Sequence, residues 1–282
     1  MDWLEAVQRL RAARTPSVIV TLAMVRGHAP RNGGAKLVVS ADSLFGTVGG
    51  GNLEASAIAR AREMLSVGTA EPELMTLTLS DKATTEYGVQ CCGGEVTMLL
   101  EPVRVVPAVA VFGIGHVGLE LARVLSRQPI ELHLIDSRAE MLAPERIGVP
   151  GSSGPLADAE AAVLLHELAV PESALVFLPA GAHVLVMTHD HVEDLAIVEA
   201  ALGADGVASI GLIGSRSKWA RFEQQLRAAG HDDATLARVT TPIGIAGIGS
   251  KHPAAIAVSV AARVLQQLEE QVVEQAPASK PQ

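Results

Sequence analysis

Aromatic residues are scarce in this chain, whose 282 residues include four phenylalanines, two tryptophans and one tyrosine. Proteins that hold single-stranded nucleic acid stack its bases on aromatic side chains, so this composition disfavours that class. Cations are also in the minority: 22 Lys and Arg against 31 Asp and Glu leave a net charge of −9. We therefore expect no nucleic-acid partner and no membrane partner, and any anionic ligand needs locally placed Arg, Lys and backbone N–H groups.

Cysteine is nearly absent, and the two residues present, Cys91 and Cys92, are adjacent. Adjacent cysteines form a poor structural disulfide because the ring that they close is strained. The chain also lacks an uncharged apolar run of about 18 residues, the length that a membrane span needs. Its acidic first residues, Met1–Glu5, do not resemble a secretory leader. These features together predict a reduced, cytoplasmic protein.

Aliphatic residues are abundant, and they surround a glycine-rich turn in the middle of the chain. The apolar run Val109–Phe112 leads into a G-x-G-x-x-G turn, and a second apolar run, Ile130–Ile135, ends on Asp136. The glycines of the turn are Gly113, Gly115 and Gly118. This spacing predicts a strand, a phosphate-binding turn, a helix and a second strand that carries a ribose-binding acid at its tip. A Rossmann fold without a ligand is the alternative.

The second half of the chain alternates predicted strands with predicted helices, which favours a doubly wound parallel sheet. The further strands are expected at His183–Met187 and Val207–Ile213, and the helices at Val117–Ser126, Val192–Leu202, Lys218–Ala229 and Pro253–Glu270. Residues 145–182 give no clear pattern.

The first half mixes strands and helices without that alternation, so we expect an α+β domain there. Its strands are predicted at Ser17–Val25, Ala35–Ser40, Leu74–Leu79 and Glu95–Glu101, and Asn52 is expected to cap a helix that runs to about Ser66. The fold class is therefore α/β, a C-terminal Rossmann-like domain (107–272) after an N-terminal α+β domain (1–103), with a disordered tail (273–282).

Several polar residues follow the predicted strands of the second half, where a doubly wound sheet binds its ligands. His116 lies in the glycine turn, and His189 and Asp190 follow the strand at 183–187. Two histidines spaced His-x-His suit a metal, but a third ligand is needed, so we favour hydrogen bonding, with Asp190 capping the next helix. A hydroxyl and two cations begin another helix and predict an anion site: Ser215, Arg216 and Lys218.

The first half offers cations, glycines and thiols. Arg31 and Lys36 flank a turn between strands, and three consecutive glycines, Gly49, Gly50 and Gly51, form a second candidate nest for a phosphate. A flexible connector is the alternative for the glycines. Cys92 and Gly93 precede a strand, and a thiolate suits thiophilic metals or sulfur transfer. An inert thiol pair is the alternative there.

Eight stretches in this order resemble the XdhC/CoxI family, the xanthine dehydrogenase accessory proteins. They are GHAPRNGGAK, GTVGGGNLE, CCGGEVTMLLE, VFGIGHVG, LIDSR, VMTHDHVEDL, IGLIGSRSKWARF and PIGIAGIGSKHPAAIAVSVAARVL. The resemblance implies a chaperone, not an enzyme, that binds the molybdenum cofactor (molybdopterin), protects it during sulfuration and inserts it into xanthine dehydrogenase or a related molybdenum hydroxylase. A cysteine desulfurase is the other implied partner, and we expect a homo-oligomer.

The resemblance also implies a role for some residues. Cys92 matches the family's Cys-Gly-Gly, so it is the candidate to approach the molybdenum or its sulfur. Cys91 is an additional thiol, and His28 stands where the family usually has a small hydroxyl residue.

The second hypothesis is an NAD(P)-dependent oxidoreductase that uses the Rossmann site, and a regulatory domain that senses NAD is the third. In these readings Asp136 favours NAD, whereas Arg138 offers a contact for a 2′-phosphate. His189 with Asp190 is then the candidate proton donor.

Overall fold

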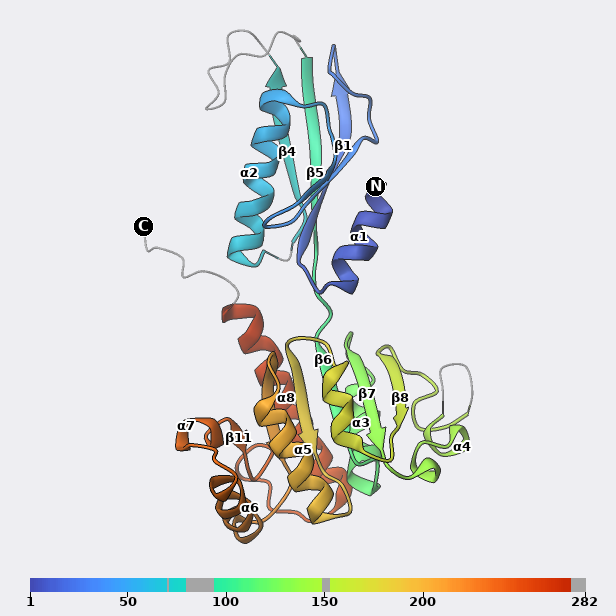
Figure 1. Ribbon diagram of the computed structural model, residues 1–282. Helices are drawn as coiled ribbons and strands as arrows, with labels where there is room; N and C mark the ends of the chain where they lie inside the picture. Colours follow the sequence, from blue (N-terminus) through green and yellow to red (C-terminus); the bar gives the residue numbers. More distant parts are fainter. Residues whose placement is uncertain (70, 80–93, 149–152, 275–282) are drawn as a thin grey trace. The chain divides into compact units, whose positions relative to one another are not determined.

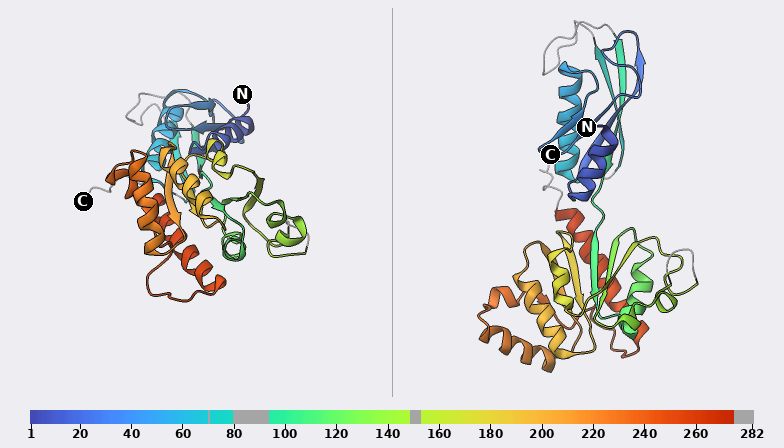
Figure 2. Two further views of the ribbon diagram at one scale, coloured as in Figure 1. Left: turned by 60° about the horizontal axis from the view of Figure 1, so that its bottom comes forward. Right: turned by 45° about the vertical axis from the view of Figure 1, so that its right-hand side comes forward.

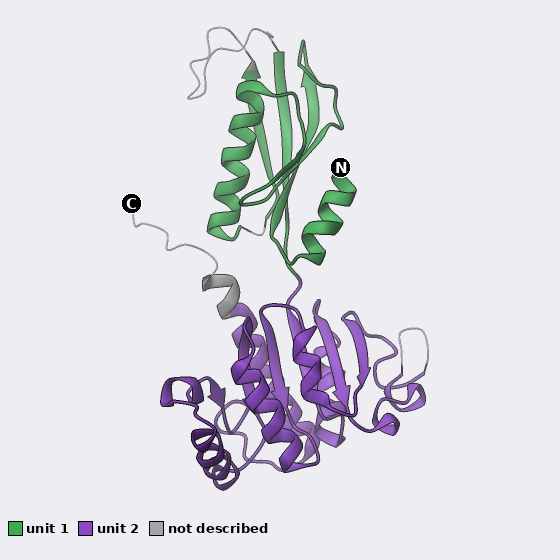
Figure 3. Ribbon diagram, in the orientation of Figure 1, with its two compact units in different colours: residues 1–105, 270–282 green, residues 106–269 purple. Residues whose placement is uncertain are grey.

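The computed structural model describes residues 1–69, 71–79, 94–148 and 153–274. The chain divides into two compact units, one of residues 1–105 with 270–282 and one of residues 106–269 (Figure 3). The division falls between Val105 and Val106.

Unit 1 is built on a five-stranded antiparallel sheet with the strand order β3-β2-β1-β5-β4 (Figure 1). Its elements are α1 (Trp3–Ala12), β1 (Ser17–Arg26), β2 (Lys36–Val39), β3 (Leu44–Gly46), α2 (Gly51–Val67), β4 (Glu73–Leu79) and β5 (Gly94–Val103). The helix α2 covers one face of the sheet and α1 the other, because alternate residues of β1 and β2 point to opposite faces. The predicted α+β arrangement is confirmed.

The start of α2 differs from the prediction. The helix begins at Gly51 with Gly50 as its N-cap, so Asn52 lies inside the first turn and does not cap it. Strand β3 was not predicted either, since its three residues are too few for a periodic pattern.

Unit 2 is a six-stranded parallel sheet with the order β11-β10-β9-β6-β7-β8. Its strands are β6 (Ala108–Phe112), β7 (Glu131–Asp136), β8 (Ala162–Glu167), β9 (Ala182–Val186), β10 (Val207–Leu212) and β11 (Val239–Thr240). Its helices and 3₁₀ turns are α3 (His116–Leu125), η1 (Ala139–Met141), α4 (Pro144–Ile147), η2 (Pro171–Val176), α5 (His191–Gly203), α6 (Arg216–Ala228), α7 (Asp233–Leu236) and α8 (Pro253–Glu274).

Helices cover both faces of this sheet, as Figures 1 and 2 show. The apolar side chains of α3 and α8 pack on one face, and those of α5 and α6 on the other. Strands β6 and β9 are buried along their whole length, which is why they read as unbroken apolar runs. The predicted doubly wound fold is therefore confirmed.

The C-terminal helix runs further than predicted. It ends at Glu274, so residues 273 and 274 of the predicted disordered tail are helical, and the rest of that tail lies outside the described residues.

Candidate functional site

The strand order of unit 2 reverses between β6 and β9, the neighbouring strands from which the chain departs in opposite directions. We call the carboxyl ends of β6, β7 and β9 the switch-point edge. In open α/β sheets ligands bind at this edge.

The three glycines of the turn after β6 have different roles. A Cβ on Gly113 would lie 2.5 Å from the carbonyl oxygen of Met187, and one on Gly118 would lie 2.1 Å from the carbonyl oxygen of Gly113. These two glycines are thus required for packing. A Cβ on Gly115 would meet no heavy atom of the described chain within 4 Å. Gly115 therefore faces open space, where a ligand can approach the backbone closely.

The turn also presents the N-terminus of α3. Gly115 is the N-cap and, as a glycine, has no side chain to accept from the first N–H groups of the helix. His116 is the first residue of α3 and is exposed beside it. Free N–H groups and the helix dipole favour an anion at such a position.

Arg146, which was not predicted, reaches the same turn from α4. Its guanidinium donates hydrogen bonds to the carbonyl oxygens of Met141 at 2.5 Å and Gly115 at 3.5 Å. The pattern around residue 145 gave no signal for it, because the contact depends on the fold of the chain after β7.

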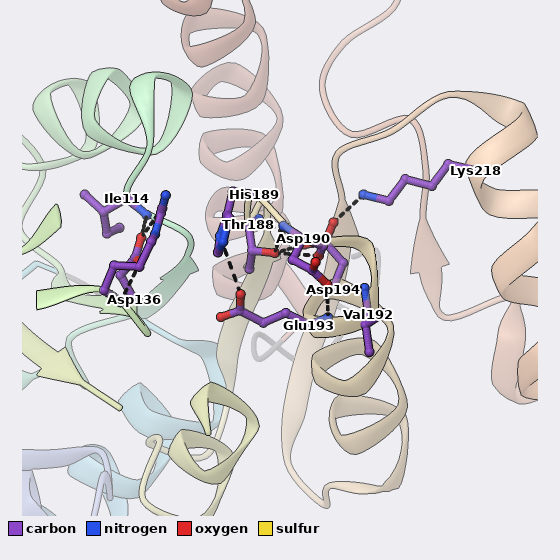
Figure 4. A network of polar contacts seen from close by, with 10 residues as sticks. Ile114, Asp136, Thr188, His189, Asp190, Val192, Glu193, Asp194 and Lys218 are labelled. Atoms are coloured by element: carbon purple, nitrogen blue, oxygen red, sulfur yellow. Dashed lines mark hydrogen bonds and ion pairs between the residues drawn. The ribbon is translucent and has the colours of Figure 1, made fainter. Parts of the chain in front are cut away.

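The carboxylate of Asp136 is held by four hydrogen bonds within the protein. Its Oδ2 accepts from the Ile114 N–H at 2.7 Å (Figure 4) and from Arg138 Nη2 at 3.0 Å. Its Oδ1 accepts from the Arg138 N–H at 3.0 Å and from Arg138 Nε at 2.9 Å. Only 2% of its side chain is exposed. Burial alone raises the pKa of Asp136, but the hydrogen bonds from Arg138 and Ile114 outweigh it and hold the pKa below its ordinary value.

The segment after β9 starts α5 with a well-formed cap. Asp190 accepts hydrogen bonds from the Val192 N–H at 2.6 Å and the Glu193 N–H at 3.1 Å, which confirms its predicted capping role and lowers its pKa. His189 is half-exposed, and its Nδ1 lies 3.7 Å from Glu193. Among the described residues no three His, Cys, Asp or Glu side chains are grouped to hold a metal ion.

Glu193 connects α5 with the segment after β7. Its side chain is 14% exposed, lies beside His189 and hydrogen-bonds to Ser137. Burial raises the pKa of Glu193, the neighbouring charges of Asp136 and Asp194 act in the same direction, and Ser137 and His189 oppose them.

Lys218 does not lie where a ligand would use its charge. Its ammonium is buried against the carboxylate of Asp194 (Figure 4). It also donates to the carbonyl oxygen of Ile213 at 2.9 Å. The other oxygen of Asp194 accepts from the N–H and hydroxyl of Thr188 at 2.9 and 2.8 Å. This buried pair joins the ends of β9 and β10, so the predicted ligand-neutralising role of Lys218 gives way to an internal one.

The other residues of that predicted anion site lie at the start of α6. Ser215 is the N-cap, and its hydroxyl accepts from the Lys218 N–H at 3.2 Å, while Arg216 is exposed. The hydroxyl of Ser215 is therefore used to cap α6.

In unit 1 a carboxylate of the chain itself binds the loop of residues 47–51, which we call the glycine loop. One oxygen of Glu54, in the first turn of α2, accepts hydrogen bonds from the Thr47 hydroxyl, the Val48 N–H at 3.0 Å and the Gly50 N–H at 3.2 Å. All three consecutive glycines have positive φ, at 132°, 72° and 59° for Gly49, Gly50 and Gly51. The predicted phosphate nest therefore already holds a carboxylate of the chain itself.

The two cations predicted on the turn between strands make separate contacts. A Cβ on Gly49 would lie 3.7 Å from Arg31 Cγ, so Arg31 is next to the loop. Lys36 instead donates to the Thr21 hydroxyl at 2.7 Å and lies 5.0 Å above the Trp3 ring.

Cys91, Cys92 and Gly93 lie outside the described residues. The next residue, Gly94, packs against the turn that contains His28, because a Cβ there would lie 2.3 Å from the His28 carbonyl oxygen. The predicted roles of Cys92 and Gly93 stay predictions.

No helix in the described part of the chain is long and apolar enough to cross a membrane.

The residues that form the switch-point edge lie in a part of the chain that matches a known protein family. Residues 109–264 match the model of the XdhC Rossmann domain, and residues 10–78 match that of the XdhC and CoxI family. The chain is 27% identical over 268 residues to the uncharacterized protein YqeB of Escherichia coli K12. That match covers 94% of this chain but only 46% of YqeB, so the chain spans about half the length of this relative.

Two solved structures are similar to lower degrees. A crystal structure described as a xanthine dehydrogenase from Bacillus halodurans is 18% identical with a TM-score of 0.47, over 100% of this chain and 98% of that one. ChuY of Escherichia coli CFT073 is 15% identical with a TM-score of 0.33, over 62% of this chain and 100% of that one. Both TM-scores are below 0.5, so we draw nothing from either structure. On the two family matches, which include more than half of its residues, the chain belongs to the XdhC and CoxI family.

Proposed function

We propose that this protein binds the molybdenum cofactor, protects it while its sulfido ligand is installed, and inserts it into xanthine dehydrogenase or a related molybdenum hydroxylase. The family match over residues 109–264 and 10–78 carries this proposal. In this role the protein is an accessory factor without turnover of its own. Its proposed partners are the hydroxylase and the cysteine desulfurase that supplies sulfur, and we propose that it acts as a homo-oligomer.

The glycine turn of unit 2 fits the phosphate of molybdopterin. Gly115 leaves the backbone open to a ligand, and the N-terminus of α3 offers N–H groups to it. Arg146 and the exposed His116 lie at the same turn and supply positive charge or hydrogen bonds. A phosphate at Gly115 is therefore the contact that these residues would support.

The fit at the glycine loop of unit 1 is different. Since Glu54 already occupies the N–H groups there, a phosphate would have to displace a carboxylate that accepts three hydrogen bonds. We propose instead that the loop holds α2 and Arg31 in place, and that Cys92 supplies the thiol. The bound cofactor contributes the dithiolene-held molybdenum, for which a thiolate is a suitable soft neighbour.

The test replaces Cys92 and compares it with its neighbour. Cys92→Ala should fold normally but activate less apo-hydroxylase than the wild type in a reconstitution with molybdenum cofactor. Cys91→Ala is the matched control, because it removes an adjacent thiol outside the family's Cys-Gly-Gly. Equal activation by the wild type and Cys92→Ala would remove Cys92 from the mechanism, and no activation by the wild type would contradict the proposed function itself.

A further inference from the structure

The end of β7 is where a Rossmann domain normally recognises a dinucleotide. An acid at the tip of the second strand accepts hydrogen bonds from the ribose hydroxyls of NAD. Asp136 stands at that position, as the last residue of β7. A role in ribose binding requires that its carboxylate has acceptor positions to spare.

The carboxylate of Asp136 has none to spare. A carboxylate offers about four acceptor positions, two on each oxygen. Oδ1 accepts from the N–H and Nε of Arg138, and Oδ2 accepts from the Ile114 N–H and Arg138 Nη2. All four bonds are 2.7 to 3.0 Å long, and the side chain is 2% exposed. Asp136 therefore does not fit a ribose diol.

Rotation of Arg138 away from Asp136 would be opposed by the surrounding charges. Two of the four bonds to Asp136 come from the guanidinium of Arg138 and would be lost on rotation. Without the guanidinium, Asp136 would face Glu193 with no compensating cation from Arg138, and the charge of Asp136 already raises the pKa of Glu193. The clamp between Asp136 and Arg138 is thus the favourable arrangement of these groups.

A 2′-phosphate, the group that distinguishes NADP, does not fit either. Arg138 is the cation at this position, but Nε and Nη2 are already bonded to Asp136. Glu140 and Glu193 also lie close enough to raise the pKa of Arg138. A phosphate dianion would meet three carboxylates around one guanidinium, which is repulsive.

We infer that Asp136 is a positioning residue that fixes the glycine turn through Ile114, and that the Asp136–Arg138 clamp excludes NAD and NADP from the switch-point edge. What remains at this edge is the open backbone at Gly115. If the proposed function holds, the clamp restricts the ligand of this edge to a phosphate ester that places no ribose diol at the end of β7.

Removal of the Asp136–Arg138 clamp should create a binding site for the ribose of NAD⁺ at Asp136. In Arg138→Leu the carboxylate of Asp136 loses the two guanidinium donors, Nε on Oδ1 and Nη2 on Oδ2, and keeps the N–H of residue 138. One acceptor position on each oxygen is then open to the two ribose hydroxyls. We expect NAD⁺ to bind this variant about tenfold or more tightly than it binds the wild type. NADP⁺ should show no such gain, because its 2′-phosphate would face the freed carboxylate.

The measurement is isothermal titration calorimetry of the full chain with NAD⁺ and NADP⁺. Arg123→Leu is the matched control, since Arg123 is an exposed cation that pairs with Glu120 on α3. Arg138→Gln is the second variant if the leucine does not fold, and circular dichroism checks both. A gain for NAD⁺ alone, absent from Arg123→Leu, supports the inference.

Two results would overturn it. The first is micromolar NAD⁺ or NADP⁺ binding by the wild type that Asp136→Asn weakens. The second is an unchanged NAD⁺ affinity in both Arg138 variants. Molybdenum and pterin retention, measured on the same proteins, separates a failure here from a failure of the proposed function, because neither nucleotide enters that assay.

Discussion

Replacing two glycines of the same turn by alanine should affect the stability of unit 2 very differently. Gly113 has a φ of 95°, and a Cβ on it would lie 2.5 Å from both the Met187 carbonyl oxygen and the Thr188 Cα. Gly115 has a φ of −70°, which any residue adopts, and its Cβ would point into open space. The prediction is that Gly113→Ala unfolds readily, whereas Gly115→Ala is about as stable as the wild type.

The magnitudes follow from two separate costs. A left-handed conformation costs an alanine about 1–2 kcal/mol, and overpacking against a backbone that cannot move adds about 1–3 kcal/mol. Gly113→Ala should therefore lose about 2–5 kcal/mol of unfolding free energy. Gly115→Ala has neither cost, so its change should stay within about 1 kcal/mol.

Urea denaturation followed by the fluorescence of Trp219 measures this difference. Trp219 lies on α6 and packs against the core of unit 2, and Trp3→Phe removes the only other tryptophan. Equal destabilisation by both alanines, or a loss below about 1 kcal/mol for Gly113→Ala, would refute the reasoning. Gly115→Val tests the function of the same turn. This variant should fold but retain less cofactor, because its side chain would fill the space through which the ligand approaches the backbone.

Three further predictions concern internal carboxylates. Asp194→Asn and Lys218→Met should each lose about 3–5 kcal/mol of unfolding free energy in urea, with the double variant losing less than their sum, because each leaves a buried charge unpaired; strictly additive losses would argue against the pair. Glu193→Gln should be up to about 1 kcal/mol more stable than the wild type at pH 7. The raised pKa of Glu193 means that the folded protein holds its proton more tightly, so wild-type stability falls as pH rises from 4.5 through the folded pKa, and thermal melts across this window should show no such fall in the variant. Glu54→Gln should destabilise unit 1 by about 1–2 kcal/mol, whereas Glu63→Gln, in an exposed pair on the same helix, should cost under about 1 kcal/mol in the same melts; similar losses would contradict the role of the glycine loop.

Long buried elements were predictable from the sequence, and short exposed ones were not. Strands β6 and β9 are buried on both faces, so their apolar runs identify them. Strand β11 has two residues and β8 lies at the edge of the sheet with a half-exposed pattern, so neither carries a clear periodic signal. The Rossmann class was predictable because the G-x-G-x-x-G turn lies between two apolar runs, the second of which ends on Asp136.

The partners of the site residues were harder to predict than their positions. The spacing correctly placed Asp136 at the tip of β7, but the sequence does not show that Ile114 and Arg138 use all its acceptor positions. The bond between Asp194 and Lys218 joins residues 24 positions apart, which only the fold brings together. Glu54 was closer to prediction, since an acid one helical turn after a glycine loop can reach its N–H groups.

The most direct test of the account is the identity of the ligand. The purified protein is mixed with molybdenum cofactor, the unbound fraction is removed by gel filtration, and molybdenum and pterin are quantified in the protein peak, with NAD⁺ and NADP⁺ in parallel runs. The account predicts near-stoichiometric molybdenum and pterin and neither nucleotide. Retention of NAD⁺ without molybdenum or pterin would contradict it.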